Sequence, residues 1–516
     1  MQCASQINAS PVFIKLFGCD FLVLFPEILL FINTVIILVY GVVYSTSRAK
    51  GTPVIVRSVS WLSMIALVLS LILVMNNPIN HAVFFFSCLI IDELGIFLKG
   101  LVLVSAMICI IVALEYLKKE KQNSFEHMVL ILLSVLSMCL MLSSYDFISM
   151  YLAIELQSLS FYVLAASRRD SEFSTEAGLK YFVLGAFSSG ILLFGSSIAY
   201  GFTGITNFEE LAKVFSGASD DKNLFVLVSL LFLIVGFLFK LSAAPFHMWS
   251  PDVYEGSPMF VTAFFSTVPK IAVLGLFLRI LLFCFYDFIS YWQNITLVCA
   301  VISMGFACLA ALSQKKVKRL LAFSSITHIG YILAGLSCGT LEGLQSLLVY
   351  LVLYILMTLN FFASLLSLRN SFSFNEEFKY INDFRMLSKT NGLLAFNLTV
   401  VLFSMVGIPP LAGFWSKFYL FFATISSSLY TVALVGVLAS VVSCFFYIRM
   451  IKTMYFESLS TSPIVKPVMK KWVSYEPLDR EKSIIIAISF FTILLIIGHL
   501  NILFLLTHKA SLTFFG

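Results

Sequence analysis

Long apolar runs recur along the whole chain, and short polar segments separate them. A helix needs roughly 20 mostly apolar residues to cross a bilayer. We therefore expect an all-α polytopic membrane protein with about 14 transmembrane helices, numbered one to fourteen in chain order. The pattern places them at about 21–44, 58–76, 94–117, 127–143, 145–167, 177–201, 223–246, 259–286, 292–312, 319–338, 342–368, 391–423, 429–451 and 484–508.

The loops between these runs alternate in charge. The odd-numbered loops hold 22 of the 33 Lys and Arg residues, whereas the even-numbered loops hold only Lys213 and Lys222. Basic residues collect in loops that face the cytoplasm or the organelle matrix. Because a missed span would scramble this alternation, it favours fourteen helices with both termini on the outer side.

Composition agrees with a membrane protein and excludes several other classes. Hydrophobic residues make up 60% of the 516 positions and charged residues 12%, against about 25% charged in soluble domains. The net charge of +6 lies in the inner loops, so it does not indicate nucleic acid binding. The ten cysteines form no C-x-x-C pair, so we expect neither a metal site nor attached haem. Residues 1–20 lack the pattern of a cleavable signal peptide.

Three lysines lie deep within predicted spans: Lys240, Lys270 and Lys417. Each would cost at least about 2.5–3.5 kcal/mol at a lipid-facing helix centre. We expect them to face a protein interior or a wet cavity; the alternative is a structural ion pair. Glu155 lies near the middle of helix five. His328 lies in the middle of helix ten, either as a hydrogen-bonded packing residue or as a proton carrier.

The other charges in or beside the spans lie nearer to helix ends. A long side chain there can reach water by snorkelling, or it can serve a function inside the protein. This choice stays open for Lys99, Lys180, Arg279 and Arg449. It stays open for Glu27 too, which lies near the start of helix one and is either an interfacial or helix-terminus charge or an acid with a function. We expect Asp92, Glu93 and Asp146, at span edges, to be solvated.

Two spans contain a helix break beside a lysine. Helix seven reads GFLFKLSAAPFHMW, with Pro245 after Lys240, and helix twelve reads GIPPLAGFWSK, with Pro409 and Pro410 before Lys417. Proline removes a helical hydrogen bond, and freed backbone groups persist at membrane depth only where protein or water covers them. Paired breaks at matching places in two halves point to a transport path.

Residue spacing predicts a repeat. Lys240 to Lys417 spans 177 residues, Glu155 to His328 spans 173, and Lys270 to Arg449 spans 179. We therefore expect helices four to eight (127–286) to recur as helices nine to thirteen (292–456), inverted because five is odd. Residues 21–126 would hold helices one to three, and residues 457–516 an inner loop and helix fourteen.

These groups in series suggest a path for protons. A lysine in a cavity of low dielectric constant loses its proton more readily, and a nearby carboxylate favours the charged form again. Approach and withdrawal of Glu155 would thus load and unload Lys240, and Lys270 and Lys417 would continue the path through bridging waters. No phosphate-binding or dinucleotide-binding motif is present, so a partner must supply the energy.

Several stretches carry a resemblance to a known family: LAIELQSLSFYVLAAS, STEAGLKYFVLGAFSSGILLFG, FKLSAAPFHMWSPDVYEGSP, KVKRLLAFSSITHIGY and GIPPLAGFWSKFYLFF. They resemble the NADH dehydrogenase subunit 2 family of respiratory complex I, in the mitochondrial form of land plants. The resemblance covers residues 21 to 508, and it implies that residues 1–20 are an extra leader of uncertain role.

The resemblance implies an antiporter-like fold with two inverted five-helix repeats, and proton translocation driven by NADH:ubiquinone oxidoreduction in other subunits. It implies a proton path through Glu155, Lys240, Lys270, His328 and Lys417. It also implies that no cofactor binds this chain, since NADH, FMN, iron–sulfur clusters and ubiquinone bind other subunits. The implied partners are other membrane subunits, including antiporter-like subunit 4 and subunit 4L, and lipids. The implied location is the mitochondrial inner membrane, with both termini in the intermembrane space.

Two alternatives remain open. A cation/proton antiporter subunit of the related multisubunit family would share the fold and the lysines. A membrane scaffold that only bridges other subunits would leave the mid-membrane lysines unexplained.

Overall fold

The computed structural model describes residues 21, 23–44, 56–77, 81–120, 124–217, 224–368, 378–457 and 479–515. The predicted leader, residues 1–20, and parts of the first and thirteenth loops lie outside these residues. The elements are α2 (Phe25–Tyr44), α3 (Val56–Met75), β1 (Ala82–Phe84), β2 (Leu89–Ile91), α4 (Glu93–Lys119), α5 (Glu126–Ser143), α6 (Phe147–Ala165), α7 (Glu172–Thr203), α8 (Phe208–Gly217), α9 (Leu224–Leu241), α10 (Trp249–Gly256), α11 (Met259–Arg279), η2 (Ile280–Cys284), η3 (Tyr286–Phe288), α12 (Ile289–Leu312), α13 (Val317–Ser337), α14 (Leu341–Ser367), η4 (Ile381–Phe384), α15 (Leu387–Thr390), α16 (Gly392–Val406), α17 (Ala412–Ser426), α18 (Tyr430–Tyr455) and α20 (Arg480–Phe515).

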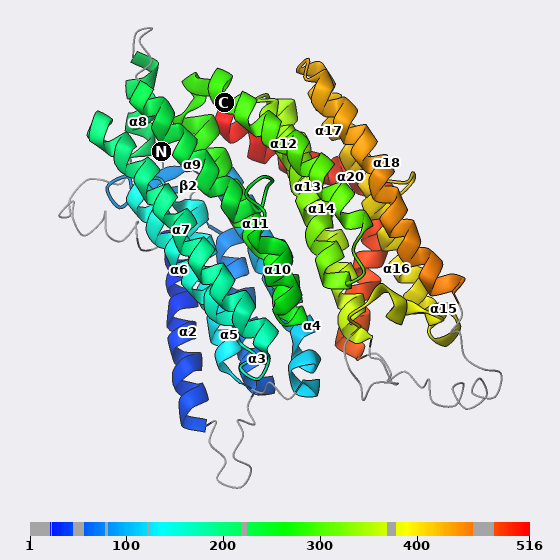
Figure 1. Cartoon of the computed structure of the whole chain (residues 1–516). Coiled ribbons are helices and arrows are strands. Elements are labelled where there is room, and N and C mark those ends of the chain that lie inside the picture. Colours follow the sequence, from blue (N-terminus) through cyan, green and yellow to red (C-terminus); the bar gives the residue numbers. More distant parts are fainter. Residues whose placement is uncertain are drawn as a thin grey trace, which may run out of the picture.

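The long helices run side by side as one bundle (Figure 1). Among the described residues, 12 helices are long and apolar enough to cross a membrane, or 13 if α20, bent by 90° between Ile496 and Leu500, is one span. The predicted span 391–423 is absent from that count because it is two 15-residue helices, α16 and α17.

Three expectations about local structure were wrong. Helix seven ends at Leu241, and a separate short helix, α10, follows the break. The chain is not purely helical, because β1 and β2 pair antiparallel before α4. Helix fourteen extends past residue 508 to Phe515. The break itself was predicted from Pro245, but the helix ends four residues before that proline, because apolar length alone does not show where the backbone turns.

The centre of the bundle is formed by α11, α13 and α14, which pack against one another. Every residue of α11 is buried. The outer helices α2, α3, α7 and α18 expose large apolar side chains instead. Such faces suit lipid, in which the driving force for burying apolar side chains is lost.

The charges near helix ends find partners within the protein. Lys99 binds Glu27 at 2.6 Å, with both side chains buried. Arg279 on α11 binds both carboxylate oxygens of Asp92 at 2.8 Å. Asp92 also accepts the backbone N–H of Gly95 at 2.9 Å and so caps α4. The expectation that Asp92 and Asp146 are solvated was wrong, because the two residues are only 4% and 8% exposed.

One arginine contact occurs twice with the same spacing. Arg279 donates to the carbonyls of Leu142 and Ser144, at the end of α5, at 2.5 and 3.1 Å. Arg449 donates to the carbonyls of Leu312 and Gln314, at the end of α12, at 3.0 and 2.5 Å. Each residue of the second set lies 170 positions after its counterpart (279 to 449, 142 to 312, 144 to 314). In its spacing and its partners Arg449 therefore matches Arg279, whereas the spacing analysis of the sequence paired it with Lys270.

A backbone contact beside these arginines also recurs. Phe147 N–H donates to the Thr206 carbonyl at 3.2 Å, and Val317 N–H donates to the Lys379 carbonyl at 3.0 Å. The return bonds join Phe208 to Tyr145 at 3.1 Å and Ile381 to Lys315 at 3.0 Å. One set lies at the end of the bundle that carries α8 and the other at the end that carries α15 (Figure 1).

The ion pair between Asp92 and Arg279 yields a stability prediction. Replacing Arg279 with Met leaves a buried carboxylate unpaired, which costs about 3–5 kcal/mol. We expect the variant Arg279→Met to lower the thermal midpoint and the amount of assembled protein. The matched control Arg449→Met, at a half-exposed position that binds carbonyls, should cost about 1 kcal/mol. Equal losses in the two variants would contradict the prediction.

Candidate functional site: a line of buried polar groups

The first broken helix places Lys240 in the last turn of α9. Ser242, at a φ of +62°, and the peptide bond before Pro245, which is cis, turn the chain towards α10. The Lys240 ammonium nitrogen is buried and has no hydrogen-bond partner among the described residues. The nearby carbonyl of Phe239 accepts two other bonds, from the indole N–H of Trp249 on α10 at 2.9 Å and from the backbone N–H of Ser242 at 3.0 Å.

Glu155 on α6 is the acid that acts electrostatically on Lys240. One of its oxygens accepts a bond from the Ser158 hydroxyl at 3.1 Å. The other oxygen is buried without a partner in the part of the chain that the structure describes. Both the acid and the lysine therefore retain bonding capacity, as a pair that forms and separates requires.

A small cavity connects Lys240 with Lys270. About 20 Å³ is accessible there to the centre of a water molecule, and Ser158, Tyr254 and Pro269 also line it. One water needs roughly 10–15 Å³ by that measure and two to four polar partners. The cavity is thus large and polar enough for one water between the two lysines.

Lys270 lies in the middle of α11 and is 6% exposed. Its ammonium donates to the Tyr354 hydroxyl at 3.1 Å, and that hydroxyl donates to the Ser266 carbonyl at 3.1 Å. The ring of Tyr354 lies 5.1 Å from the ring of His328, centroid to centroid. Tyr354 on α14 therefore links the central lysine to the histidine of α13.

His328 is buried and bonded through both ring nitrogens. Nδ1 lies 2.7 Å from the Tyr350 hydroxyl, and Nε2 lies 3.4 Å from the Tyr447 hydroxyl. A second small cavity, lined by His328, Tyr354 and Ser324, adjoins the ring. The neutral ring has one donor and one acceptor nitrogen, so it can accept a proton on one side and release one on the other.

The second broken helix holds Lys417 differently. Its ammonium donates to the carbonyls of Met405 and Val406 at 3.1 and 2.7 Å. These carbonyls end α16, where Gly407 adopts a φ of +93°. The ammonium also lies 5.0 Å from the centroid of the Tyr331 ring, which leads back towards His328. Lys417 is therefore held by the carbonyls that the break frees, at the negative end of a helix.

The five predicted residues thus fall along one line, Glu155–Lys240–Lys270–His328–Lys417. Four tyrosines that contact these residues were not predicted: Tyr331, Tyr350, Tyr354 and Tyr447. Tyr350 and Tyr354 share a helix face in LLVYLVLYILM, and Tyr331 follows His328 by three residues. That spacing is the signal that could have identified them.

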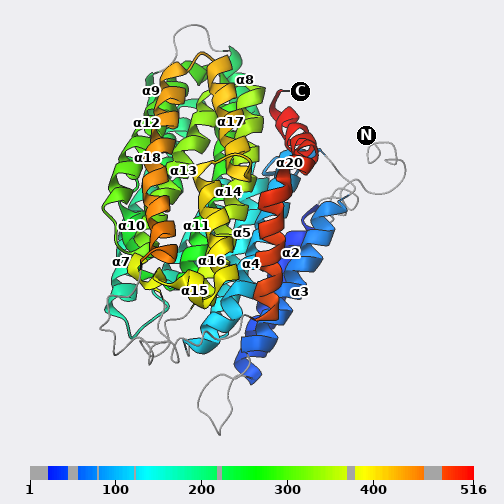
Figure 2. The same cartoon turned by 90° about the vertical axis from the view of Figure 1, so that its right-hand side faces the viewer.

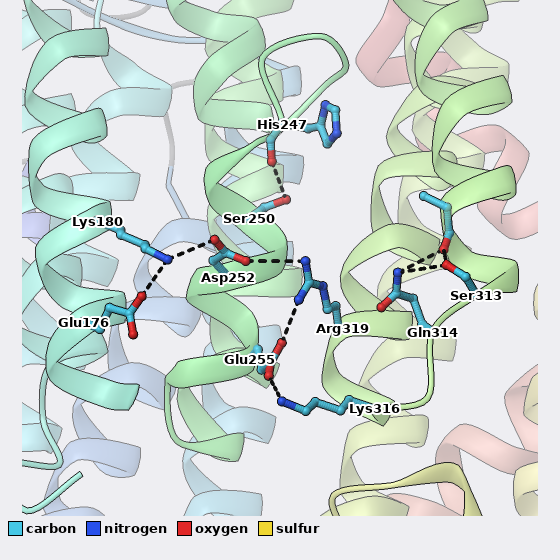
Figure 3. A network of polar contacts seen from close by, with 11 residues as sticks. Glu176, Lys180, His247, Ser250, Asp252, Glu255, Ser313, Gln314, Lys316 and Arg319 are labelled. Atoms are coloured by element: carbon cyan, nitrogen blue, oxygen red, sulfur yellow. Dashed lines mark hydrogen bonds and ion pairs between the residues drawn. The ribbon is translucent and has the colours of Figure 1, made fainter. Parts of the chain in front are cut away.

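A separate network of charges lies at the end of the bundle that carries α15 (Figures 1 and 3). Lys180 on α7 binds Glu176 at 2.7 Å and Asp252 at 3.2 Å, so it is an ion-pairing residue. Arg319 on α13 binds Asp252 at 3.7 Å and Glu255 at 3.4 Å. Lys316 also binds Glu255. The network joins α7, α10 and α13.

Comparisons with known proteins agree with this geometry. Residues 144–443 match the family described as NADH:quinone oxidoreductase/Mrp antiporter, TM. NADH-ubiquinone oxidoreductase chain 2 of Marchantia polymorpha is 53% identical over 504 residues, which cover 96% of this chain and 99% of that protein.

Two solved structures have a similar fold. A chain of respiratory complex I from Thermus thermophilus aligns with a TM-score of 0.71 and 27% identity, over 91% of this chain and 98% of that one. A chain of the Mrp complex from Dietzia sp. aligns with a TM-score of 0.76 and 20% identity, over 94% and 96%.

The junction of α16 and α17 yields one prediction. A Cβ added at Gly413 would lie 1.7 Å from the Ser404 carbonyl oxygen, so the two halves of the broken helix must separate to admit Ala. We expect Gly413→Ala to cost about 1–3 kcal/mol, as overpacking does, and to displace Lys417 from its carbonyls. Gly190→Ala, in open space on α7, is the control and should leave assembly and activity unchanged.

The hydrogen bond between Lys270 and Tyr354 yields a second prediction. Tyr354→Phe removes the hydroxyl but keeps the ring, and leaves a buried ammonium short of one partner, which costs about 1–3 kcal/mol. We expect proton translocation by the assembled protein to slow by about tenfold or more. Tyr430→Phe, at a 65% exposed position, is the control. Unchanged translocation in Tyr354→Phe would remove this tyrosine from the path.

Proposed function

This chain belongs to the NADH:quinone oxidoreductase/Mrp antiporter family of transmembrane proteins, and we infer that it is the antiporter-like subunit 2 of a respiratory complex I of the plant mitochondrial type. In that role it translocates protons, and NADH:ubiquinone oxidoreduction in the complex supplies the energy. The observation that carries the inference is a near-full-length similarity combined with a series of ionisable groups inside the bundle, from Glu155 through the lysines to His328.

The geometry supports the following proton path. Glu155 approaches Lys240 and favours its charged form; when the carboxylate withdraws, the lysine releases its proton to the cavity it shares with Lys270. The proton then passes from Lys270 through the Tyr354 region to His328. Each hydroxyl can accept a proton while donating its own. Lys417 lies beyond His328 and completes the line through the second unit.

The redox chemistry is proposed to lie in other subunits. On this proposal NADH, FMN, the iron–sulfur clusters and ubiquinone bind elsewhere, and this chain contributes proton transfer to an NADH:ubiquinone reductase. The proposed neighbours include antiporter-like subunit 4 and subunit 4L. The protein crosses the mitochondrial inner membrane several times, and we propose that both termini face the intermembrane space, from the basic odd-numbered loops.

The recurring contacts support the finer fold proposal. If α16 with α17 and the bent α20 each form one span, the described spans number fourteen. The arginine contacts and the backbone contacts each occur twice, with matching residues 170 to 173 positions apart and at opposite ends of the bundle (Figure 1). An inverted repeat of helices four to eight and nine to thirteen would produce this arrangement.

An antiporter subunit of the related multisubunit family is the less supported alternative. The likeness to the Mrp chain, at 20% identity, extends to the fold alone. The relative at 53% identity is instead an NADH-ubiquinone oxidoreductase chain 2, and the similarity covers 99% of its length. Sodium-for-proton exchange by the chain outside an NADH-oxidising assembly would favour the antiporter.

Replacing Lys240 tests the proposed function. We expect Lys240→Ala to assemble into the complex and to lower proton translocation and coupled NADH oxidation by about 10- to 100-fold. The reason is that the variant lacks the group that Glu155 loads. The exposed Lys213, paired with Glu209 on α8, gives the control Lys213→Ala. Full pumping by an assembled Lys240→Ala complex, measured in proteoliposomes, would instead indicate a scaffold.

A further inference from the structure

Polar side chains recur every four residues along the first half of α14. The series is Glu342, Ser346, Tyr350 and Tyr354. Residues four apart on a helix are neighbours on one face, and each step rises about 6 Å. Tyr354 and Tyr350 already join Lys270 and His328, whereas Ser346 and Glu342 take no part in the path described above.

These two remaining residues face an open groove. The groove has a volume of about 310 Å³, far larger than the cavities of about 20 and 10 Å³ beside Lys270 and His328. Its lining residues are Glu342, Gln345, Ser346, Tyr419, Phe422, Ala423 and Phe504. Many waters can therefore gather where the polar series ends, in contrast to the one-water cavities at its start.

The bent end of α20 forms one wall of this groove. The Gln345 side chain donates to the Phe504 carbonyl at 3.3 Å, and the rings of Tyr419 and Phe504 meet edge to face, with centroids 4.4 Å apart. The start of α14, the end of α17 and the last part of α20 lie at the end of the bundle opposite α15 (Figures 1 and 2). The groove thus opens away from the charge network of Lys316 and Arg319.

The polar groups at the end of the series have the bonding that a relay needs. Ser346 is 4% exposed and lines the groove, and its hydroxyl donates to the Gly343 carbonyl at 2.8 Å, so its lone pairs can accept a proton. One Glu342 oxygen accepts the Ser426 hydroxyl at 3.1 Å. Glu342 itself is exposed. A carboxylate in contact with bulk water exchanges protons with it directly.

We propose that Glu342 is a proton-release group at the outer end of the protein, reached from His328 along α14 through Tyr350 and Ser346. The Tyr350 hydroxyl accepts a proton from His328 and donates its own; Ser346 and a groove water repeat this step across one helical turn. Glu342 then gains the proton and passes it to water as hydronium. This outlet branches from the proposed path at His328, before Lys417. This inference rests on the proposed function, because it needs protons to reach His328.

The test uses the intact complex in proteoliposomes, with NADH added outside and proton release measured in the lumen. A positioned acid or base speeds a proton-transfer step by at least about 100-fold. Because water in the groove can partly replace the missing carboxylate, we expect Glu342→Gln to slow proton release by about tenfold. Glu342→Asp should restore most of the rate, and Ser346→Ala should slow it. An impermeant sulfonate buffer raised inside the vesicles should rescue Glu342→Gln, and the same buffer outside should not.

Controls separate this outlet from the proposed function. Glu210→Gln removes an exposed acid of α8 at the same end of the bundle and should change nothing. Unchanged release in Glu342→Gln, with loss of release in Lys270→Ala, would overturn the outlet and leave the function standing. Unchanged release in both variants would overturn both. A third outcome is that Glu342→Asp loses proton release as well and that lumenal buffer rescues neither variant. This result would show a structural role for Glu342 and would also overturn the outlet.

Discussion

An ammonium group inside an apolar bundle must take its oxygen partners from its own protein. Lipid offers none, and a helix offers few, because its carbonyls are already bonded. The bond from Lys417 to the carbonyls of Met405 and Val406 meets this constraint. The order of features in helix twelve follows from it. The helix ends, Gly407 turns the chain with a positive φ, two prolines prevent the helix from resuming at once, and the lysine returns to the freed carbonyls.

Helix seven breaks beside its lysine in another way. There the Phe239 carbonyl accepts the Trp249 indole N–H and the Ser242 backbone N–H, and the nearby lysine stays without a bonded partner among the described residues. One unit therefore holds its lysine fixed while the other leaves it available to Glu155. The arginine contacts at 279 and 449 are alike in the two units. The two halves are thus alike in their arginine contacts and differ in how the lysine at the broken helix is bonded.

Much of the fold could be predicted because membrane spans depend on apolar length, which is a local property of the sequence. The buried lysines could be predicted for a related reason, since a charge within an apolar run is costly wherever the chain folds. The pair of Asp92 and Arg279 could not, because its partners lie 187 residues apart and nothing local links them. The tyrosines were missed because an aromatic side chain in an apolar run resembles core packing, and its hydroxyl matters only once His328 or Lys270 lies beside it. The sequence paired Lys270 with Arg449 because both carry a positive charge. The contacts instead match Arg449 with Arg279, since each donates to two carbonyls at a helix end.

The charge network bears on how large the proposed movement at Lys240 must be. Arg319 on α13 binds two acids of α10, and Lys180 on α7 binds one of them, so α10 is tied to helices on both sides (Figure 3). Tyr254 of α10 also lines the cavity between the lysines. A large displacement of α10 would break these ion pairs together with the bond from Trp249 to Phe239. The groups with bonding capacity to spare are instead the Lys240 ammonium and one oxygen of Glu155. The loading step is therefore best understood as a movement of these two side chains within a framework of fixed helices.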